Sequence, residues 1–203
     1  MKKLLLLVLA VSLGLAAVSC RDRNETETKK APEFNFRKTT WGMSRDQVKA
    51  SEDKKPTGER PEVVTYRGEL DGIPAIVGYL FDEDKLTRAG YVMRGSYDDP
   101  NRYIEDYDKV KESMIKTYGA PAQDEMQWKE GVEGSEDPAE YGKAACDGNL
   151  RYTTVWTDGV TMITERLAGE DGSCKHGLMF ESIDLYINKP AQEKAPAGPS
   201  PAP

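Results

Sequence analysis

The chain holds a single histidine, His176, and only three cysteines among its 203 residues. Zinc sites are built mainly from histidine and cysteine, and neither a His-Glu-x-x-His nor a Cys-x-x-Cys pattern occurs. The chain also contains no P-loop, no Gly-x-Gly-x-x-Gly fingerprint and no Gly-x-Ser-x-Gly elbow. We therefore expect no catalytic residue, no metal ion and no cofactor, and we expect that the protein is not an enzyme.

One short segment, "GSCKHG", nevertheless brings Ser173, Cys174 and His176 together. A nucleophile and its base need facing side chains about 3 Å apart, with a third group that orients the base. Neighbours in one short loop rarely reach that geometry, and a disulfide at Cys174 would remove the thiol. The segment therefore gives no catalytic assignment.

Acidic residues outnumber basic residues, 35 to 28. The formal net charge is −7, and it becomes −9 when Lys2 and Lys3 are left out. No stretch interleaves basic and aromatic residues in the way that a phosphate backbone favours. Nucleic acid and anionic lipid surfaces are therefore not expected partners.

Residues 1–19 have the composition of a signal peptide. Two lysines precede an apolar run, residues 4–15, which is too short to span a bilayer comfortably as a helix. The run leads into "LAAVSC", which ends at Cys20 and resembles the lipobox of bacterial lipoproteins. The resemblance implies that Cys20 becomes the first mature residue and carries a lipid that anchors the chain to a membrane. The alternative is an ordinary secretory signal with a chance cysteine.

Arg21 follows the predicted lipidation site. In the sorting pattern of enteric lipoproteins, an aspartate at this position favours retention in the inner membrane. The resemblance therefore favours the outer membrane of a bacterial cell envelope over the inner membrane.

The other two cysteines have one possible pairing if Cys20 is lipidated. Export would place Cys146 and Cys174 in an oxidising compartment, where cysteine pairs tend to close. We predict a Cys146–Cys174 disulfide, with two free thiols as the alternative.

Composition divides the exported chain into a tether, a domain and a tail. Residues 20–33 contain the lipidation site and a polar tether without apolar periodicity, and residues 189–203 form a Pro- and Ala-rich tail. We predict both to be disordered. Residues 34–188 are long enough for a single α+β domain with a real core, whose halves cover about 34–95 and 96–188.

Each half has the pattern of a helix followed by an antiparallel meander. Ser44 and Gln47 form a predicted capping box that opens the first helix, and residues 99–118 predict the second. Alternation and Asp-Gly turns predict strands at 63–70, 73–81, 86–93, 125–128, 150–156, 160–167 and 177–187. Residues 130–147 are interpreted as a long acidic loop. The two halves predict tandem helix-plus-meander units in one sheet, with the helices packed on one face.

Two pairs of segments resemble small bacterial envelope proteins. The first pair is "FRKTTWGMSRDQVKASE" and "VVTYRGELDGIPAIVGYLFDEDKL", and the second pair is "YGAPAQDEMQW" and "GNLRYTTVWTDGVTMITERL". The expected architecture is also similar to the outer-membrane lipoprotein family SmpA/OmlA and to the repeats of beta-lactamase inhibitory protein. Both families act by binding proteins and have no catalytic residues, so the resemblance implies a binding module. The likeness to these two families rests on architecture alone.

We therefore expect a membrane-anchored, non-catalytic module that binds an envelope protein partner. Such a module predicts an apolar or aromatic patch on the free sheet face, and Trp41, Trp128 and Trp156 are candidate anchors if they are exposed. The interpretation as core residues stays open for all three tryptophans. The alternative is a periplasmic small-ligand-binding or inhibitory protein, which predicts a deep pocket.

Two further hypotheses stay open. A carbohydrate-acting enzyme would need two carboxylates that converge only in the fold. A loose calcium site could lie in the acidic segment 133–140, although that segment lacks the EF-hand spacing and a solvated loop is the plainer interpretation.

Overall fold

The structure is a computed structural model that describes residues 33–190, all of which belong to one compact unit. The predicted signal peptide, Cys20 and the greater part of the predicted tether and tail lie outside the described residues. The helical elements are α1 (Arg45–Ser51), α2 (Asn101–Tyr118), η1 (Pro138–Glu140), α3 (Tyr141–Cys146) and η2 (Ile183–Ile187). The strands are β1 (Gly58–Arg60), β2 (Val63–Leu70), β3 (Ile73–Asp82), β4 (Lys85–Met93), β5 (Gln123–Trp128), β6 (Leu150–Thr157), β7 (Thr161–Glu170) and β8 (Ser173–Ser182).

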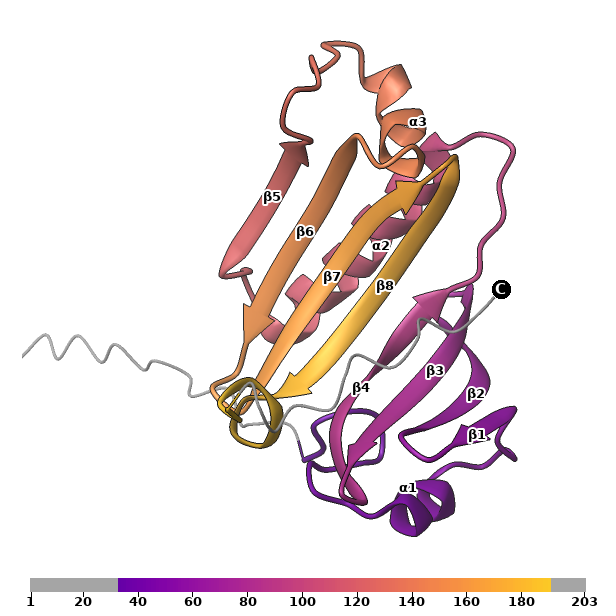
Figure 1. Cartoon of the computed structure of the whole chain (residues 1–203), viewed down its shortest axis with the longest axis vertical. Coiled ribbons are helices and arrows are strands. Elements are labelled where there is room, and N and C mark those ends of the chain that lie inside the picture. Colours follow the sequence, from indigo (N-terminus) through magenta and orange to yellow (C-terminus); the bar gives the residue numbers. More distant parts are fainter. Residues whose placement is uncertain (1–32, 191–203) are drawn as a thin grey trace, which may run out of the picture. The chain divides into compact units, whose positions relative to one another are not determined.

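The strands form one antiparallel sheet of eight, which confirms the predicted α+β class. The strand order is β1-β2-β3-β4-β8-β7-β6-β5, so β4 and β8 pair at the centre (Figure 1). Within residues 33–190, no helix is long and apolar enough to cross a membrane.

Short-range sequence signals account for the hairpins and for the starts of the helices. Asp71 and Gly72 both have positive φ, 51° and 78°, as a two-residue turn between β2 and β3 requires. The Ser44 side chain accepts from the Gln47 amide, and the Gln47 side chain accepts from the Ser44 amide, so the predicted capping box is present. The apolar stripe of α2 is buried, and that helix ends before Gly119.

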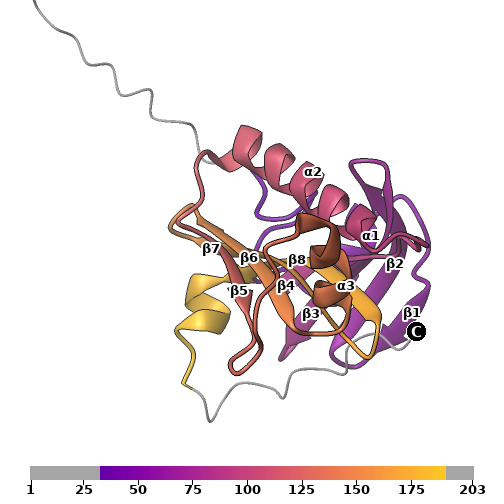
Figure 2. The ribbon, with the colours of Figure 1, turned by 90° about the horizontal axis from the view of Figure 1, so that it is seen from above.

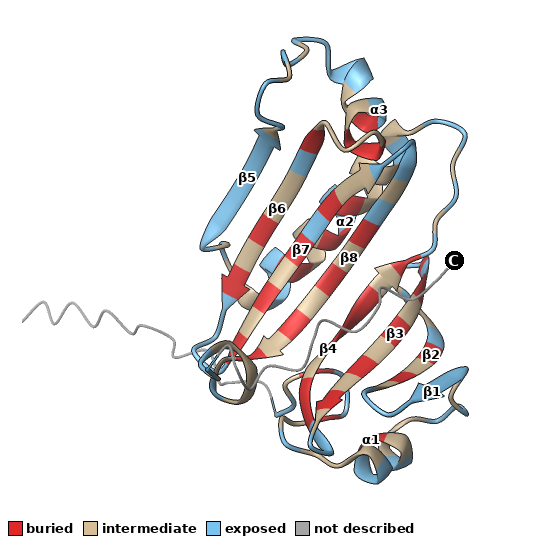
Figure 3. Cartoon of the chain, viewed as in Figure 1, coloured by how far each residue is buried: buried red, intermediate tan, exposed pale blue. Residues whose placement is uncertain are grey.

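The core lies on one face of the sheet. A row of neighbouring residues crosses the sheet on this face: Tyr66, Val77, Tyr91, Leu178, Glu165, Thr154 and Asp124. Every member except Asp124 is buried (Figure 3). Val48 of α1, Tyr107 and Val110 of α2 and Ala145 of α3 belong to the same buried clusters, so these three helices cover this face. Figure 2 shows α2 on one side of the sheet and η2 on the other.

Several sequence predictions were wrong in detail. The three-residue strand β1 was missed, and the predicted loop at 130–147 contains η1 and α3. The predicted strand at 177–187 ends at Ser182, because the Ser182 side chain accepts from the Leu185 amide and starts the π-helix η2.

The predicted disulfide between Cys146 and Cys174 is confirmed, with 4.2 Å between the two Cα atoms. Cys174 lies in β8, close to the tight turn at Asp171 and Gly172 that joins β7 to β8. Helix α3 carries Cys146 onto the sheet. A Cβ atom on Gly169 would lie 2.3 Å from the Cys146 carbonyl oxygen, so glycine allows this close approach.

Candidate functional site

The face of the sheet opposite α2 is the candidate site, and we call it the uncovered face. One row of adjacent residues on it crosses from β2 to β5: Thr65, Gly78, Gly90, Met179, Thr164, Val155 and Gln123. The next row contains Arg67, Ile76, Val92, Gly177, Arg166, Thr153 and Glu125. Side chains on alternate residues of a strand point to opposite faces, so both rows point away from the helices.

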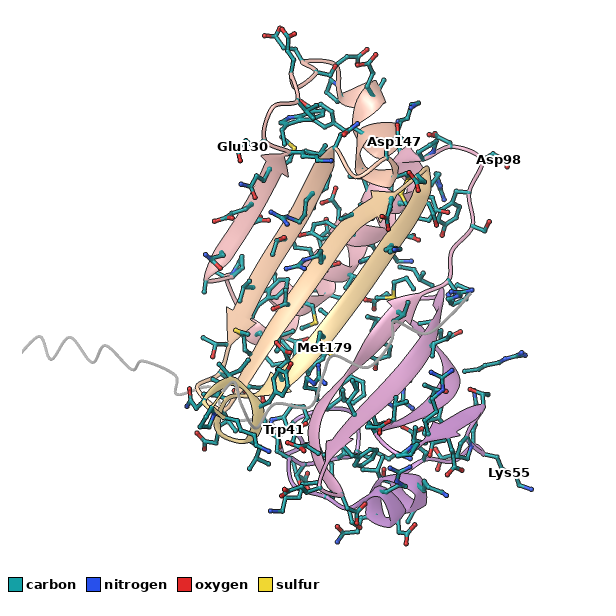
Figure 4. The ribbon with its side chains drawn as sticks, in the orientation of Figure 1. Trp41, Lys55, Asp98, Glu130, Asp147 and Met179 are labelled. Atoms are coloured by element: carbon teal, nitrogen blue, oxygen red, sulfur yellow. A yellow bond between two sulfur atoms is a disulfide. The ribbon has the colours of Figure 1, made fainter. Side chains whose placement is uncertain are left out.

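The middle of the uncovered face is mildly apolar and half-buried. Ile76, Val92, Met179 and Val155 are each of intermediate exposure, although no helix from α1 to α3 packs over them. Figure 4 labels Met179 on β8, near the middle of this face. Among the described helices, only η2 approaches this face. The Arg88 guanidinium of β4 lies there, 4.1 Å from the ring centroid of Tyr186 in η2. No described helix covers the rest of the apolar centre.

Exposed cations lie on the β6–β7 side of the uncovered face. Arg151 and Arg166 line a hollow of about 210 Å³ together with Glu125, Gln127 and Thr153. Arg151 Nη2 donates to Gln127 Oε1 at 2.6 Å. The side chain of Arg166 is exposed and makes no hydrogen bond or ion pair with any residue in 33–190, although its backbone belongs to the ladders with β6 and β8. Guanidinium groups donate in a planar fork that suits carboxylates, so this hollow can receive an acidic side chain.

The three tryptophans that the sequence analysis named as candidate interface anchors are held by contacts within the domain. Trp156 is 1% exposed, and its indole donates to the Gly119 carbonyl. Trp41 is partly buried, and its Nε1 donates to Thr161 Oγ1 at 3.0 Å. Trp128 is partly buried against the Tyr141 ring. None of the three lies in the middle of the uncovered face, where the apolar residues are aliphatic side chains and a methionine.

A second polar group lies beneath α2. The carboxyl of Glu165 and the imidazole of His176 are buried, with Oε1 and Nε2 2.9 Å apart. Burial raises the pKa of Glu165 to about 9 and lowers the pKa of His176 to about 4. The Tyr107 hydroxyl bonds Thr154 nearby at 2.5 Å. Cys174 is disulfide-bonded, so it does not supply His176 with a thiol nucleophile.

A third group joins the N-terminal segment to the end of α1. Arg37 pairs with Glu52 at 2.8 Å, and the Tyr79 hydroxyl donates to the same carboxylate. A hollow of about 480 Å³ lies beside this group, with Tyr66 and Lys54 among its lining residues. Its lining carries charges of both signs, in contrast to the mostly apolar pockets that hold drug-sized ligands.

The acidic segment 133–140 was the candidate for a loose calcium site. Its first part is an exposed loop and its end is η1, where the Asp137 side chain accepts from the Ala139 amide. Among residues 33–190, no group of three or more histidine, cysteine or acidic residues is arranged to hold a metal ion.

Sequence reasoning missed Arg151, Arg166 and Met179. The outward alternation of polar residues along β6 and β7 carried a signal for the two arginines. No signal in the sequence indicates that β8 pairs with β4, and this pairing makes the face continuous. Comparison of the chain with protein-family models, with curated proteins and with solved structures found no match, and the resemblances stated above therefore stay predictions.

Proposed function

We propose that this chain is a lipid-anchored protein of the bacterial cell envelope whose domain binds another protein through the uncovered face. The observation that carries the proposal is the group of half-buried apolar side chains on the uncovered face, which none of the helices α1 to α3 covers: Ile76 of β3, Val92 of β4, Met179 of β8 and Val155 of β6. Anchoring at Cys20 and a location at the outer membrane complete the proposal, and they rest on the sequence alone.

The chemistry of the face indicates the kind of partner. Its apolar centre suits aliphatic or aromatic side chains, and Arg151 and Arg166 stand exposed beside it. These two exposed guanidinium groups are locally complementary to carboxylates on a partner surface. We therefore infer a partner whose contact surface has an apolar centre and carboxylates at one side.

We further infer that the sheet is built from two tandem units. α1 is followed by β1 to β4, and α2 is followed by β5 to β8, with α3 inserted after β5. The last strands of the two runs, β4 and β8, lie side by side at the centre. This order is similar to what the resemblance to protein-binding repeats implies, and it makes one wide sheet face available.

Site-specific photo-crosslinking in the native cell tests the proposal. A photoreactive residue replaces Met179 in the full chain, and in a matched variant it replaces Lys116, an exposed residue of α2. We expect an adduct with an envelope protein from position 179 and a much weaker one from position 116. The Arg166→Glu variant should lower the yield at 179, because it reverses charge beside the partner's carboxylates, whereas Lys116→Glu should not. Equal yields from both positions, or no effect of Arg166→Glu, would contradict the proposal.

The hollow beside Arg37 and Glu52 supports a second candidate, the binding of a small polar ligand. This function predicts that the low-molecular-mass fraction of a periplasmic extract raises the unfolding temperature of the protein. The Lys54→Gln variant removes an exposed lining charge and should reduce that rise. An unchanged unfolding temperature would exclude this candidate in favour of the protein-binding face.

A further inference from the structure

Strand β5 forms one edge of the sheet, and its outer side is open to a further strand. It pairs with β6 on one side only, and no described strand pairs with its other side (Figure 1). Its first five residues are exposed (Figure 3), and Trp128 at its end is partly buried. Met126 lies at its middle and is 47% exposed, and it is the only exposed large apolar residue within the described strands.

The opposite edge of the sheet is protected in the usual ways. β1 has three residues, and Pro56 and Pro61 flank it, so it offers little backbone for pairing. β5 has six residues, with no proline and no lysine among them. Its Asp124 and Glu125 give some protection, but the backbone along the edge is otherwise available.

The hydrogen-bond pattern shows which amides of β5 point outward. The Lys129 amide donates to the Asn149 carbonyl at 2.8 Å, and these two residues lie opposite each other as the next pair beyond Trp128–Leu150 in the β5–β6 ladder. Hydrogen-bonded and non-hydrogen-bonded pairs alternate along an antiparallel ladder. The amides and carbonyls of Asp124, Met126 and Trp128 therefore face away from β6.

We propose that β5 pairs with β5 of a second copy of this chain, antiparallel, about a twofold axis at Met126. The sheets of the two copies then continue across the axis. Asp124, Met126 and Trp128 lie opposite the second copy's Trp128, Met126 and Asp124, and these three pairs would exchange about six backbone hydrogen bonds. A symmetric pairing of this kind uses the same strand on both copies, as a twofold interface requires.

The side chains select this register. In an antiparallel pair, opposed residues point to the same face, so the twofold axis must pass through one residue of β5. An axis at Glu125 would set two carboxylates directly opposite each other, which is unfavourable. An axis at Met126 instead sets the two exposed methionines against each other and buries both.

Charges on the uncovered face agree with the same register. With the axis at Met126, the second copy's Glu125 lies opposite Gln127. Gln127 is the cross-strand partner of Arg151 and accepts its hydrogen bond at 2.6 Å. The Glu125 carboxylate of the second copy would therefore lie in the same cross-strand row as Gln127 and the Arg151 guanidinium. The twofold symmetry repeats this contact on the other side of the axis.

Cysteine crosslinking of the purified full chain in nonionic detergent tests the register. Met126→Cys would place the two introduced Cα atoms about 5.5 Å apart, within the range for a disulfide. Glu125→Cys is the matched control, because its two copies would lie on a diagonal about 7–8 Å apart. Mild oxidation should convert most of Met126→Cys to a covalent dimer and leave Glu125→Cys at the level of the unsubstituted chain. Equal crosslinking at both positions, or crosslinking at 125 alone, would overturn the proposal.

Sedimentation equilibrium tests the pairing without new cysteines. The unsubstituted chain should show twice the monomer mass after correction for detergent. Met126→Lys should show the monomer mass because two ammonium groups would then be opposed, and Met126→Leu should keep the dimer. Circular dichroism verifies that Met126→Lys is folded. A monomer mass for the unsubstituted chain, or a dimer mass for Met126→Lys, would overturn the proposal.

Discussion

Glu165 and His176 face each other on adjacent strands beneath α2, with 2.9 Å between Oε1 and Nε2 and side chains 0% and 2% exposed. Burial disfavours charge on each group, so the pKa of Glu165 rises to about 9 and that of His176 falls to about 4. The pair therefore holds one proton and stays neutral as a whole across this range, whichever atom carries that proton. Glu165 Oε2 and His176 Nδ1 have no hydrogen-bond partner among the described residues.

This pair predicts that stability falls as pH rises above 6.5. The unfolded chain loses its last proton at this site near 6.5, the ordinary pKa of histidine, whereas the native pair keeps its proton up to about pH 9. The native state then binds more protons, so the free energy of unfolding decreases by at most about 1.4 kcal/mol per pH unit. Between 4.5 and 6.5 both states hold one proton and this contribution is flat. Urea denaturation at a series of pH values measures it.

Two substitutions separate the contributions of Glu165 and His176 to the pH dependence of stability. In Glu165→Gln, the free energy of unfolding should no longer fall as pH rises above 6.5, but it should fall as pH drops below 6.5, because buried His176 resists protonation. In His176→Gln, the free energy of unfolding should fall as pH rises above about 4.5, because buried Glu165 resists ionisation. Lys111, Asp108 and Asp124 also act on the pKa of Glu165, Lys111 lowering it and the two aspartates raising it. Identical pH profiles in both variants and the parent would contradict the assignment.

Gly90 is predicted to be essential to the central pairing of the sheet. A Cβ atom there would lie 2.4 Å from the Leu178 carbonyl oxygen of β8. Gly90→Ala should therefore force β4 and β8 apart and lower the free energy of unfolding by about 1–3 kcal/mol. Gly78→Ala is the matched control, because a Cβ atom there would meet nothing within 4 Å. Chemical denaturation should show that control within about 0.5 kcal/mol of the parent.

Local physics explains which parts of the fold the sequence predicted. The capping box of α1, the Asp71-Gly72 turn and the apolar stripe of α2 each depend on residues a few positions apart. Helix α3 also carried a local signal, because Asp137 caps the turn that precedes it and Pro138 starts that turn. The glycines and acidic residues before it made the whole segment resemble a loop.

Non-local pairing explains what the sequence did not predict. The β4–β8 contact joins residues about ninety positions apart, and no turn or periodicity encodes it. The uncovered face exists only because of that contact. Strand β1 is held by pairing with β2 despite its length of three residues. The residues after Ser182 keep a strand-like apolar pattern, but the side-chain cap at Ser182 turns the chain into η2.

The disulfide should contribute strongly to stability. Cys146 and Cys174 are 28 residues apart, and closing a loop of that length lowers the entropy of the unfolded chain. The corresponding stabilisation is about 3–4 kcal/mol. The double variant Cys146→Ser/Cys174→Ser should lose about that amount in urea denaturation. Reduction of the parent should give a similar loss, and a loss under 1 kcal/mol in both measurements would contradict the estimate.

Trp41 is predicted to join the N-terminal segment to the sheet through Thr161. The indole Nε1 donates to Thr161 Oγ1 at 3.0 Å, and the ring packs against the main buried cluster. Trp41→Phe removes the donor and keeps an aromatic ring, whereas Thr161→Val removes the acceptor and keeps the shape. Each single change should lower the free energy of unfolding by about 1–3 kcal/mol, because each leaves a partner unsatisfied.

The double variant decides whether the hydrogen bond itself matters. If the two residues act through that bond, the loss in Trp41→Phe/Thr161→Val should be smaller than the sum of the single losses by about 0.5–1.5 kcal/mol. Ser44→Ala, which weakens the nearby helix cap by about 1 kcal/mol, should add to Trp41→Phe without coupling if the two sites act independently. Strict additivity of Trp41→Phe and Thr161→Val would show that Trp41 stabilises the segment by packing alone.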